Sequence, residues 1–172
     1  KMPSVDFPDA SVGSTYMAER LTEAQANGNA VRGSAGAPLP LTLAASNVSF
    51  GTGSQFNYLG ATTKVLTVNG AVYIYGDLTI GPDVTWAGKG AIFVEGNINA
   101  LDGFEPATPA NLITQDAVGL ICTGNMQLGQ NSGNGTKYVG FFFGNTSITI
   151  QKAKIYGNVF GNTVNLPTTG TR

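Results

Sequence analysis

Two carboxylates, Asp77 and Glu95, are the residues of this sequence best suited to acid–base chemistry. Most glycoside hydrolases work through a pair of carboxyl groups that flank the scissile bond, so hydrolysis of a polysaccharide is the enzyme hypothesis to weigh. Histidine, the commonest general base, does not occur among the 172 residues. The GxSxG, HExxH and P-loop patterns are also missing. With no complete catalytic constellation, we expect a protein that is not an enzyme.

Metal and thiol chemistry have equally little support. Cys122 is the single cysteine, so it cannot form an internal disulfide or belong to a zinc cluster. The spacing of Asp77, Asp83 and Asp102 matches no calcium-binding loop. We therefore expect no metal site and no cofactor, and we expect Cys122 to be a small buried hydrophobic residue.

The distribution of charge is the remaining chemical signal. All ten acidic residues lie at or before Asp116, whereas residues 117–172 carry four basic residues and no acid. Lysines beside exposed tyrosines can contact phosphates and stack on bases. The candidate DNA- or polyanion-binding residues are Lys137, Tyr138, Lys152, Lys154 and Tyr156. The alternative is that these lysines only make a sparsely charged surface soluble.

The elements that would position these residues are predicted from a repeat. The 24 glycines and the low charged fraction of 11% favour many short strands joined by tight turns. Four segments align without gaps: AVYIYGDLTIG from Ala71, AIFVEGNINAL from Ala91, GLICTGNMQLG from Gly119 and VGFFFGNTSIT from Val139. Each contains Gly followed by Asp or Asn, and these glycines are 20, 28 and 20 residues apart, with FEPATPAN filling the longer interval. The period is typical of a β-solenoid.

The aligned segments alternate apolar and polar residues, which indicates strands with one inward face. Two places before each Gly stand Ile74, Val94, Cys122 and Phe142, which we expect to be buried and stacked on successive rungs. Three places before each Gly stand Tyr73, Phe93, Ile121 and Phe141, which should form an outward stripe. The Gly-Asp/Asn steps should be corners, with Asp77 beginning a ladder that continues through Asn97, Asn125 and Asn145. The alternative architecture is a β-sandwich with accidental similarity between strands.

The first 40 residues differ from the rest. Residues 2–9 suggest an extended, proline-punctuated segment, residues 15–27 a helix, and residues 33–40 a breaker-rich linker. Met17 and Leu21 lie on one face of the helix, and we expect this face to cover the outward aromatic stripe. The predicted organisation is therefore residues 1–40 packing on a β-solenoid of residues 41–172, an all-β fold with rungs of about 20 residues and one short N-terminal helix.

The segments PSVDFPD, YMAERLTEAQANG, GAVYIYGDLTIG and GLICTGNMQLG resemble the β-solenoid domains of bacterial minor pilin-like proteins, which belong with type IV pilus assembly and natural competence. This resemblance implies an extracellular, pilus-associated module on the bacterial surface, with other pilin subunits as partners and DNA capture or adhesion as its role. The hydrophobic pilin helix is not part of the sequence, so the resemblance implies a fragment of a longer membrane-anchored protein. No membrane contact is expected of this segment itself.

Two other functions remain open at this point. A self-assembling structural solenoid, similar to bactofilins, would polymerise end to end through uncapped rungs. A carbohydrate-active enzyme would use the paired carboxylates.

Overall fold

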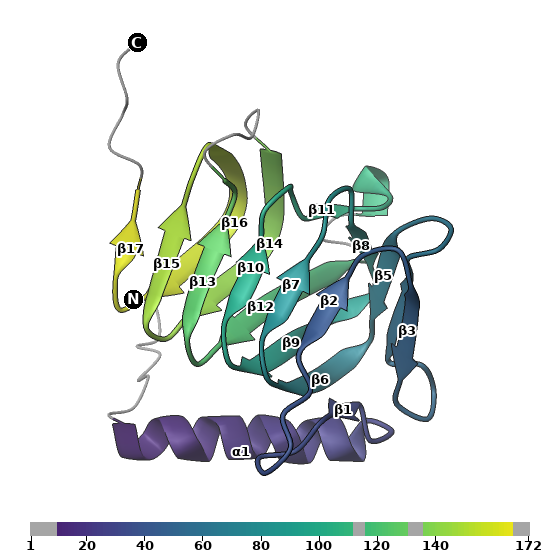
Figure 1. Cartoon of the computed structure of the whole chain (residues 1–172), viewed down its shortest axis with the longest axis vertical. Helices are drawn as coiled ribbons and strands as arrows, with labels where there is room; N and C mark the ends of the chain where they lie inside the picture. Colours follow the sequence, from purple (N-terminus) through teal and green to yellow (C-terminus); the bar gives the residue numbers. More distant parts are fainter. Residues whose placement is uncertain (1–9, 112–115, 131–135, 167–172) are drawn as a thin grey trace.

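The computed structural model describes residues 10–111, 116–130 and 136–166, which form a β-solenoid of about five turns with rungs of about 20 residues (Figure 1). The predicted fold class is confirmed. One α-helix, α1 (Ala10–Ala26), precedes the strands. The helix predicted for residues 15–27 therefore begins five residues earlier, and the extended segment predicted for residues 2–9 lies outside the described residues. No helix within the described residues is long and apolar enough to cross a membrane.

Three sheets form the sides of the solenoid. The first sheet contains β1 (Val31–Arg32), β6 (Gly70–Tyr75), β9 (Lys89–Glu95), β12 (Ala117–Cys122), β14 (Thr136–Gly144) and β16 (Ala153–Gly161). The second contains β2 (Leu41–Leu43), β7 (Leu78–Ile80), β10 (Ile98–Ala100), β13 (Asn125–Leu128), β15 (Ser147–Ile150) and β17 (Val164–Asn165). The third contains β3 (Asn47–Phe50), β4 (Phe56–Leu59), β5 (Val65–Val68), β8 (Thr85–Ala87) and β11 (Glu105–Pro106), followed by the 3-10 helix η1 (Pro109–Asn111).

Strand pairing is parallel throughout the first two sheets, as stacked rungs require. The exception is the start of the third sheet, where β3, β4 and β5 pair antiparallel. The first sheet begins with β1, a strand of two residues within the segment of residues 1–40 that was predicted to pack on the solenoid.

The inward residues of the three sheets form one continuous apolar core. Ile74, Val94 and Cys122 are buried and stack on successive rungs, as predicted. The predicted place of Phe142 in that column is wrong, because the residue paired with Cys122 is Gly144. Phe142 instead pairs with Leu120. A shift of two residues preserves the in–out alternation of a strand, so Phe142 is still fully buried.

The corners between the first and second sheets are joined by a ladder of polar side chains. Asp77 Oδ1 accepts a hydrogen bond from the backbone N–H of Asn97 at 2.7 Å, and Asn97 Oδ1 accepts one from that of Asn125 at 2.9 Å. The next member is Ser147, whose hydroxyl donates to Asn125 Oδ1 at 2.8 Å. The ladder is therefore confirmed for its first three positions, and the two-residue shift puts Ser147 where Asn145 was predicted.

Helix α1 covers the outward aromatic stripe of the first sheet and runs across its strands (Figure 1). The stripe and the helix share one apolar cluster, separate from the core, whose buried members are Met17, Ala24, Tyr73, Phe93, Ile121 and Phe143. The partly buried Leu21 packs against this cluster. The fourth member of the stripe is therefore Phe143 and not the predicted Phe141, for the same two-residue shift.

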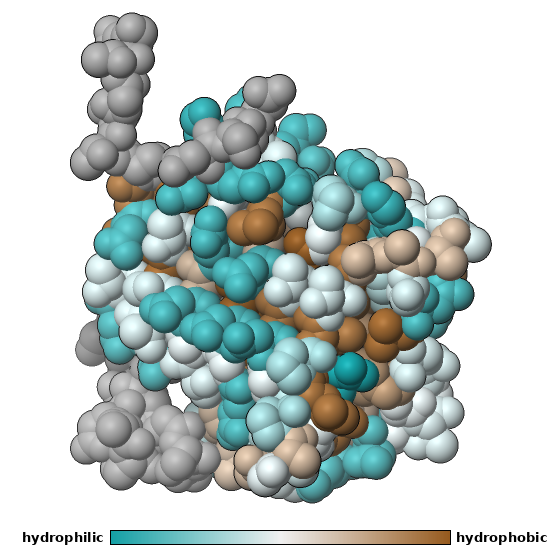
Figure 2. All heavy atoms as spheres, viewed as in Figure 1, coloured by the Kyte–Doolittle hydropathy of each residue, from teal (hydrophilic) through white to brown (hydrophobic). Residues whose placement is uncertain are grey.

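The outer face of the second sheet has a different character. Its outward residues are Thr42, Thr79, Asn99, Gln127 and Thr149. Figure 2 shows hydrophilic side chains crossing this face over β10, β13 and β15. Among the described residues, the apolar side chains on the outside of the solenoid that form a buried cluster with helix α1 belong to the first sheet.

Candidate ligand-binding groove

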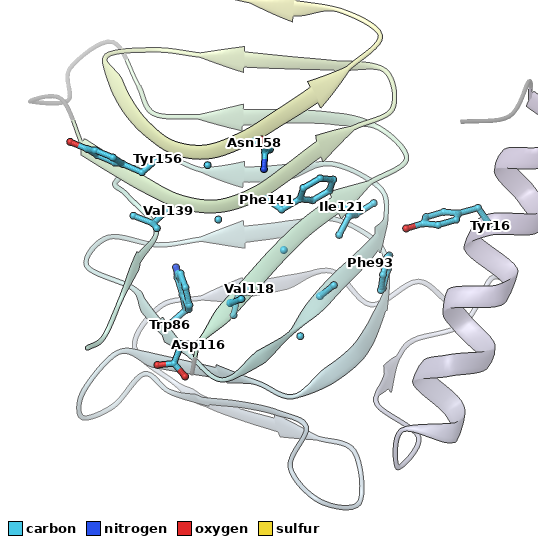
Figure 3. Close-up of a pocket in the computed structure, with 16 residues that line it drawn as sticks. Tyr16, Trp86, Phe93, Asp116, Val118, Ile121, Val139, Phe141, Tyr156 and Asn158 are labelled. Atoms are coloured by element: carbon cyan, nitrogen blue, oxygen red, sulfur yellow. The ribbon is translucent and has the colours of Figure 1, made fainter. Parts of the chain in front are cut away.

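A groove of about 820 Å³ lies on the outer face of the first sheet, beside helix α1 (Figure 3). Its floor is a row of outward residues on four neighbouring strands, paired in the order Ala91, Gly119, Phe141 and Asn158. Two of these residues have no side chain or only a methyl group, whereas the next row towards the helix carries Phe93 and Ile121. The groove exists because Ala91 and Gly119 leave a space that larger side chains at these two positions would fill.

The walls of the groove come from different parts of the fold. On the helix side Tyr16 meets the ring of Phe93 edge-on, with centroids 6.1 Å apart, and the Arg20 guanidinium lies 5.1 Å from the Tyr16 ring centroid. Burial raises the pKa of the Tyr16 hydroxyl, and the positive charge of Arg20 partly opposes this. On the far side lie Trp86 and Asp116. Both walls are therefore held by contacts that do not depend on a ligand.

The far wall is fixed by hydrogen bonds. Asp116 Oδ1 accepts a hydrogen bond from the backbone N–H of Gly88 at 2.9 Å. The Trp86 indole N–H donates to the carbonyl of Phe104 at 3.3 Å, and its ring is almost completely buried. Trp86 therefore supports the wall from the core and offers little surface to a ligand.

Three of the predicted polyanion-binding residues lie together at the end of the groove away from the helix. Lys137 and Lys154 are direct partners on β14 and β16, and Tyr156 follows two residues after Lys154 on the same strand face. Tyr156 lines the groove and is 53% exposed (Figure 3). Lys137 Nζ lies 3.6 Å from a carboxylate oxygen of Glu105, in an ion pair that is open to solvent.

Lys152 lies in the turn before β16, with a left-handed φ of 44°, and it is exposed. The lysine cluster, defined as Lys137, Lys152 and Lys154, is therefore at the strand ends beside the groove.

Tyr138 is the exception, and its prediction as a binding residue is wrong. The side chain is fully buried. Its hydroxyl donates to the carbonyl of Ala100 at 2.7 Å and accepts from the backbone N–H of Gly103 at 3.0 Å. Neighbouring residues of a strand point to opposite faces, so Lys137 and Tyr138 cannot both face outward. Burial also raises the pKa of this hydroxyl, in keeping with a place in the core.

The predicted carboxylate pair lies outside the groove lining, and both members have other contacts. Asp77 accepts the ladder hydrogen bonds of the corner, and Glu95 accepts a hydrogen bond from the Tyr73 hydroxyl at 2.7 Å. Among the described lining residues the one carboxylate is Asp116. The arrangement is suited to holding a flat or apolar group between rings, next to a positively charged edge.

Sequence reasoning missed the groove floor and the contribution of Tyr16. The available signal was the column of small residues five places before the Gly-Asp/Asn steps, which includes Ala71, Ala91 and Gly119. Comparison with protein-family models, with curated proteins and with solved structures finds no match for this chain.

Proposed function

We propose that this chain is a noncatalytic binding module of a bacterial surface protein of the pilus type, and that it captures single-stranded DNA on the outer face of the first sheet. The observation that carries the proposal is the pairing of Lys137 with Lys154 beside the exposed ring of Tyr156, at the mouth of an apolar groove. A single strand of DNA carries phosphates, which lysines bind, and flat bases, which stack on aromatic rings, so this face offers contacts to both parts of the ligand.

The aromatic side chains favour bases over a purely ionic ligand. Tyr156 and Phe141 are 53% and 36% exposed, and both line the groove. Stacking of a base on an aromatic ring contributes about 1–3 kcal/mol and tolerates any sequence. In a duplex the bases are stacked on one another, so their faces are open to these rings only in a single strand.

The lysine cluster supplies the phosphate contacts. Three lysines without a bidentate arginine imply weak binding that does not depend on sequence and falls steeply with salt. The ion pair between Lys137 and Glu105 competes with the ligand for one of the three charges. Useful capture therefore requires several copies, which pilin partner subunits in a filament would provide.

Neutralising the lysine cluster should remove most of the affinity. The variant K137Q/K152Q/K154Q keeps the aliphatic stems but loses three charges, so we expect binding of a fluorescent oligothymidylate to weaken at least about tenfold at low salt. The slope of log affinity against log salt should fall by about 2, or about 0.7 for each lost contact. The matched control is K64Q, because Lys64 is paired with Asp83 at 3.1 Å and lies outside the first sheet. Equal affinity of wild type and triple variant would reject the proposal.

Filling the groove should show how much of the DNA affinity comes from base stacking and how much from the lysine charges. A Cβ atom at Gly119 would lie 3.4 Å from Cδ1 of Ile121 and 3.7 Å from both Cβ of Ala91 and Cδ1 of Phe141, which are ordinary van der Waals contacts, so the backbone there accepts a Cβ atom. The variant G119L should weaken oligothymidylate binding about tenfold, the loss of one stacked base, and leave the salt slope unchanged. The control is G36L, because a Cβ atom at Gly36 meets nothing within 4 Å. An unchanged affinity in G119L would move the site away from the groove.

A further inference from the structure

Exposed apolar side chains gather in the last turn of the solenoid. Among the described residues seven large hydrophobic side chains are exposed, and four of them are Tyr156, Phe160, Val164 and Leu166. The terminal repeats of solenoids ordinarily carry a polar outer surface, since an apolar end associates with other molecules. In the residues that the structure describes, up to Leu166, the last turn has an apolar outer surface instead.

Among the described residues the core is also incompletely covered at this end. Ile155 and Val159 on β16 point inward but are only partly buried, whereas Phe142, which pairs with Val159 from β14, is fully buried. In the described part of the chain no strand pairs with the other side of β16, a strand of nine residues. Its outer edge offers backbone donors and acceptors, together with incompletely covered apolar residues, to a further strand.

The N-terminal end of the solenoid is built differently. The edge strand of the first sheet there, β1, has two residues. The segment after it bonds back to the first rung, with Leu39 N–H donating to the carbonyl of Tyr75 at 2.8 Å. The antiparallel strands β3 and β4 end the third sheet. A nine-residue strand such as β16 would find no matching edge at this end, so head-to-tail stacking of copies is disfavoured.

We propose that β16 pairs with β16 of a second copy of this chain, antiparallel about Gly157, so that two solenoids join through their C-terminal ends. The strand is close to self-complementary about this centre. Ile155 then lies opposite Val159 of the second copy, and Ala153 lies opposite Gly161. The two half-covered β-branched side chains of each copy meet their counterparts, which closes both cores.

The outward residues of β16 also match in this register. Lys154 lies opposite Phe160 of the second copy, and the two-fold axis makes this contact twice. An ammonium group beside an aromatic ring is a favourable pair. The first sheets of the two copies become one continuous sheet, with both grooves on the same side. This pairing does not depend on the DNA proposal, since it rests on the edge of β16, and Lys154 is the one residue that the two proposals share.

The test is a charge swap followed by sedimentation equilibrium. Wild type should show a reversible dimer. F160K should raise the dimer dissociation constant at least about tenfold, because it places two lysines opposite each other at two symmetric positions. Phe160 is 43% exposed, so the monomer tolerates the change. The double variant F160K/K154E should restore the dimer, because the carboxylate introduced at position 154 then faces the ammonium group introduced at position 160 of the second copy.

The restoration cannot arise within one chain, since positions 154 and 160 are about 20 Å apart on one strand. A wild type that is monomeric at all concentrations up to about 100 μM would overturn the proposal. The pairing through β16 would be overturned if F160K left the dimer unchanged. It would also be overturned if the double variant F160K/K154E failed to restore the dimer. Circular dichroism of each variant confirms that the fold is kept.

Discussion

Replacing Phe142 with alanine is expected to lower the free energy of unfolding by about 3–5 kcal/mol. The side chain is fully buried and packs edge-on against Tyr138, with ring centroids 6.4 Å apart. It fills the core between Leu120 and Val159 on the two neighbouring strands. Backbones held on both sides by parallel strands cannot collapse into the cavity, so the cost should fall in the upper part of this range. Urea denaturation followed by circular dichroism measures it.

The adjacent residue provides the control. Phe141 has the same side chain but points outward into the groove and is 36% exposed. F141A should cost about 1 kcal/mol or less, since it leaves no internal cavity. If the two variants lose the same stability, the alternation of β14 described above is wrong.

The thiol of Cys122 is expected to react at least about 1,000-fold more slowly in the native protein than in the unfolded chain. The side chain is 1% exposed, and burial raises its pKa from 9.0 to about 12, although hydrogen bonds from the backbone partly oppose this. At pH 8 the thiolate fraction is then about one in ten in the unfolded chain and about one in 10⁴ in the native state. Labelling with iodoacetamide with and without urea measures the ratio. Comparable rates in the two states would place the thiol in solvent.

The same shift predicts a loss of stability at alkaline pH. The native pKa of Cys122 lies above the unfolded value, so the native state binds this proton more tightly, and the associated stability is present in full below pH 9. It declines between pH 9 and pH 12, and about 1.4 kcal/mol should be lost by pH 10. Buried tyrosines such as Tyr73, whose pKa is raised chiefly by burial, add to the loss above pH 10. The free energy of unfolding of wild type and C122A is measured at pH 8 and at pH 10. The contribution of Cys122 is the part of the loss between the two pH values that wild type shows and C122A does not.

The fold could be predicted from the sequence because each rung repeats the same pattern of apolar, polar and corner residues. The in–out alternation and the corner ladder from Asp77 to Asn125 follow from columns of similar residues. The register of β14 could not be predicted, because both a 20-residue and a 22-residue interval keep large apolar residues facing inward. The pairing of Gly144 with Cys122 is decided by packing in three dimensions.

The candidate site was predictable in part. Lys154 and Tyr156, two of the predicted binding residues, are two positions apart, so the alternation of a strand puts them on one face, and both are exposed on β16. Tyr138 was misplaced because the two neighbours Lys137 and Tyr138 were assigned to the same face. The groove could not be predicted because its floor includes small residues beside a helix. Small residues leave a groove only where larger neighbours surround them, and the position of the helix relative to the sheet does not follow from the sequence.

Helix α1 has a mechanical consequence. In a stack of rungs each turn contacts only its neighbours, so a pull on one end can peel the turns away one at a time. Here α1 shares its apolar cluster with residues of four successive strands, β6, β9, β12 and β14. Peeling any of these turns therefore also disrupts the contacts that hold the others. The helix therefore couples the unfolding of these four rungs. When the solenoid is pulled along its stacking direction, we expect β16 and β17 to detach first and the four rungs to unfold together.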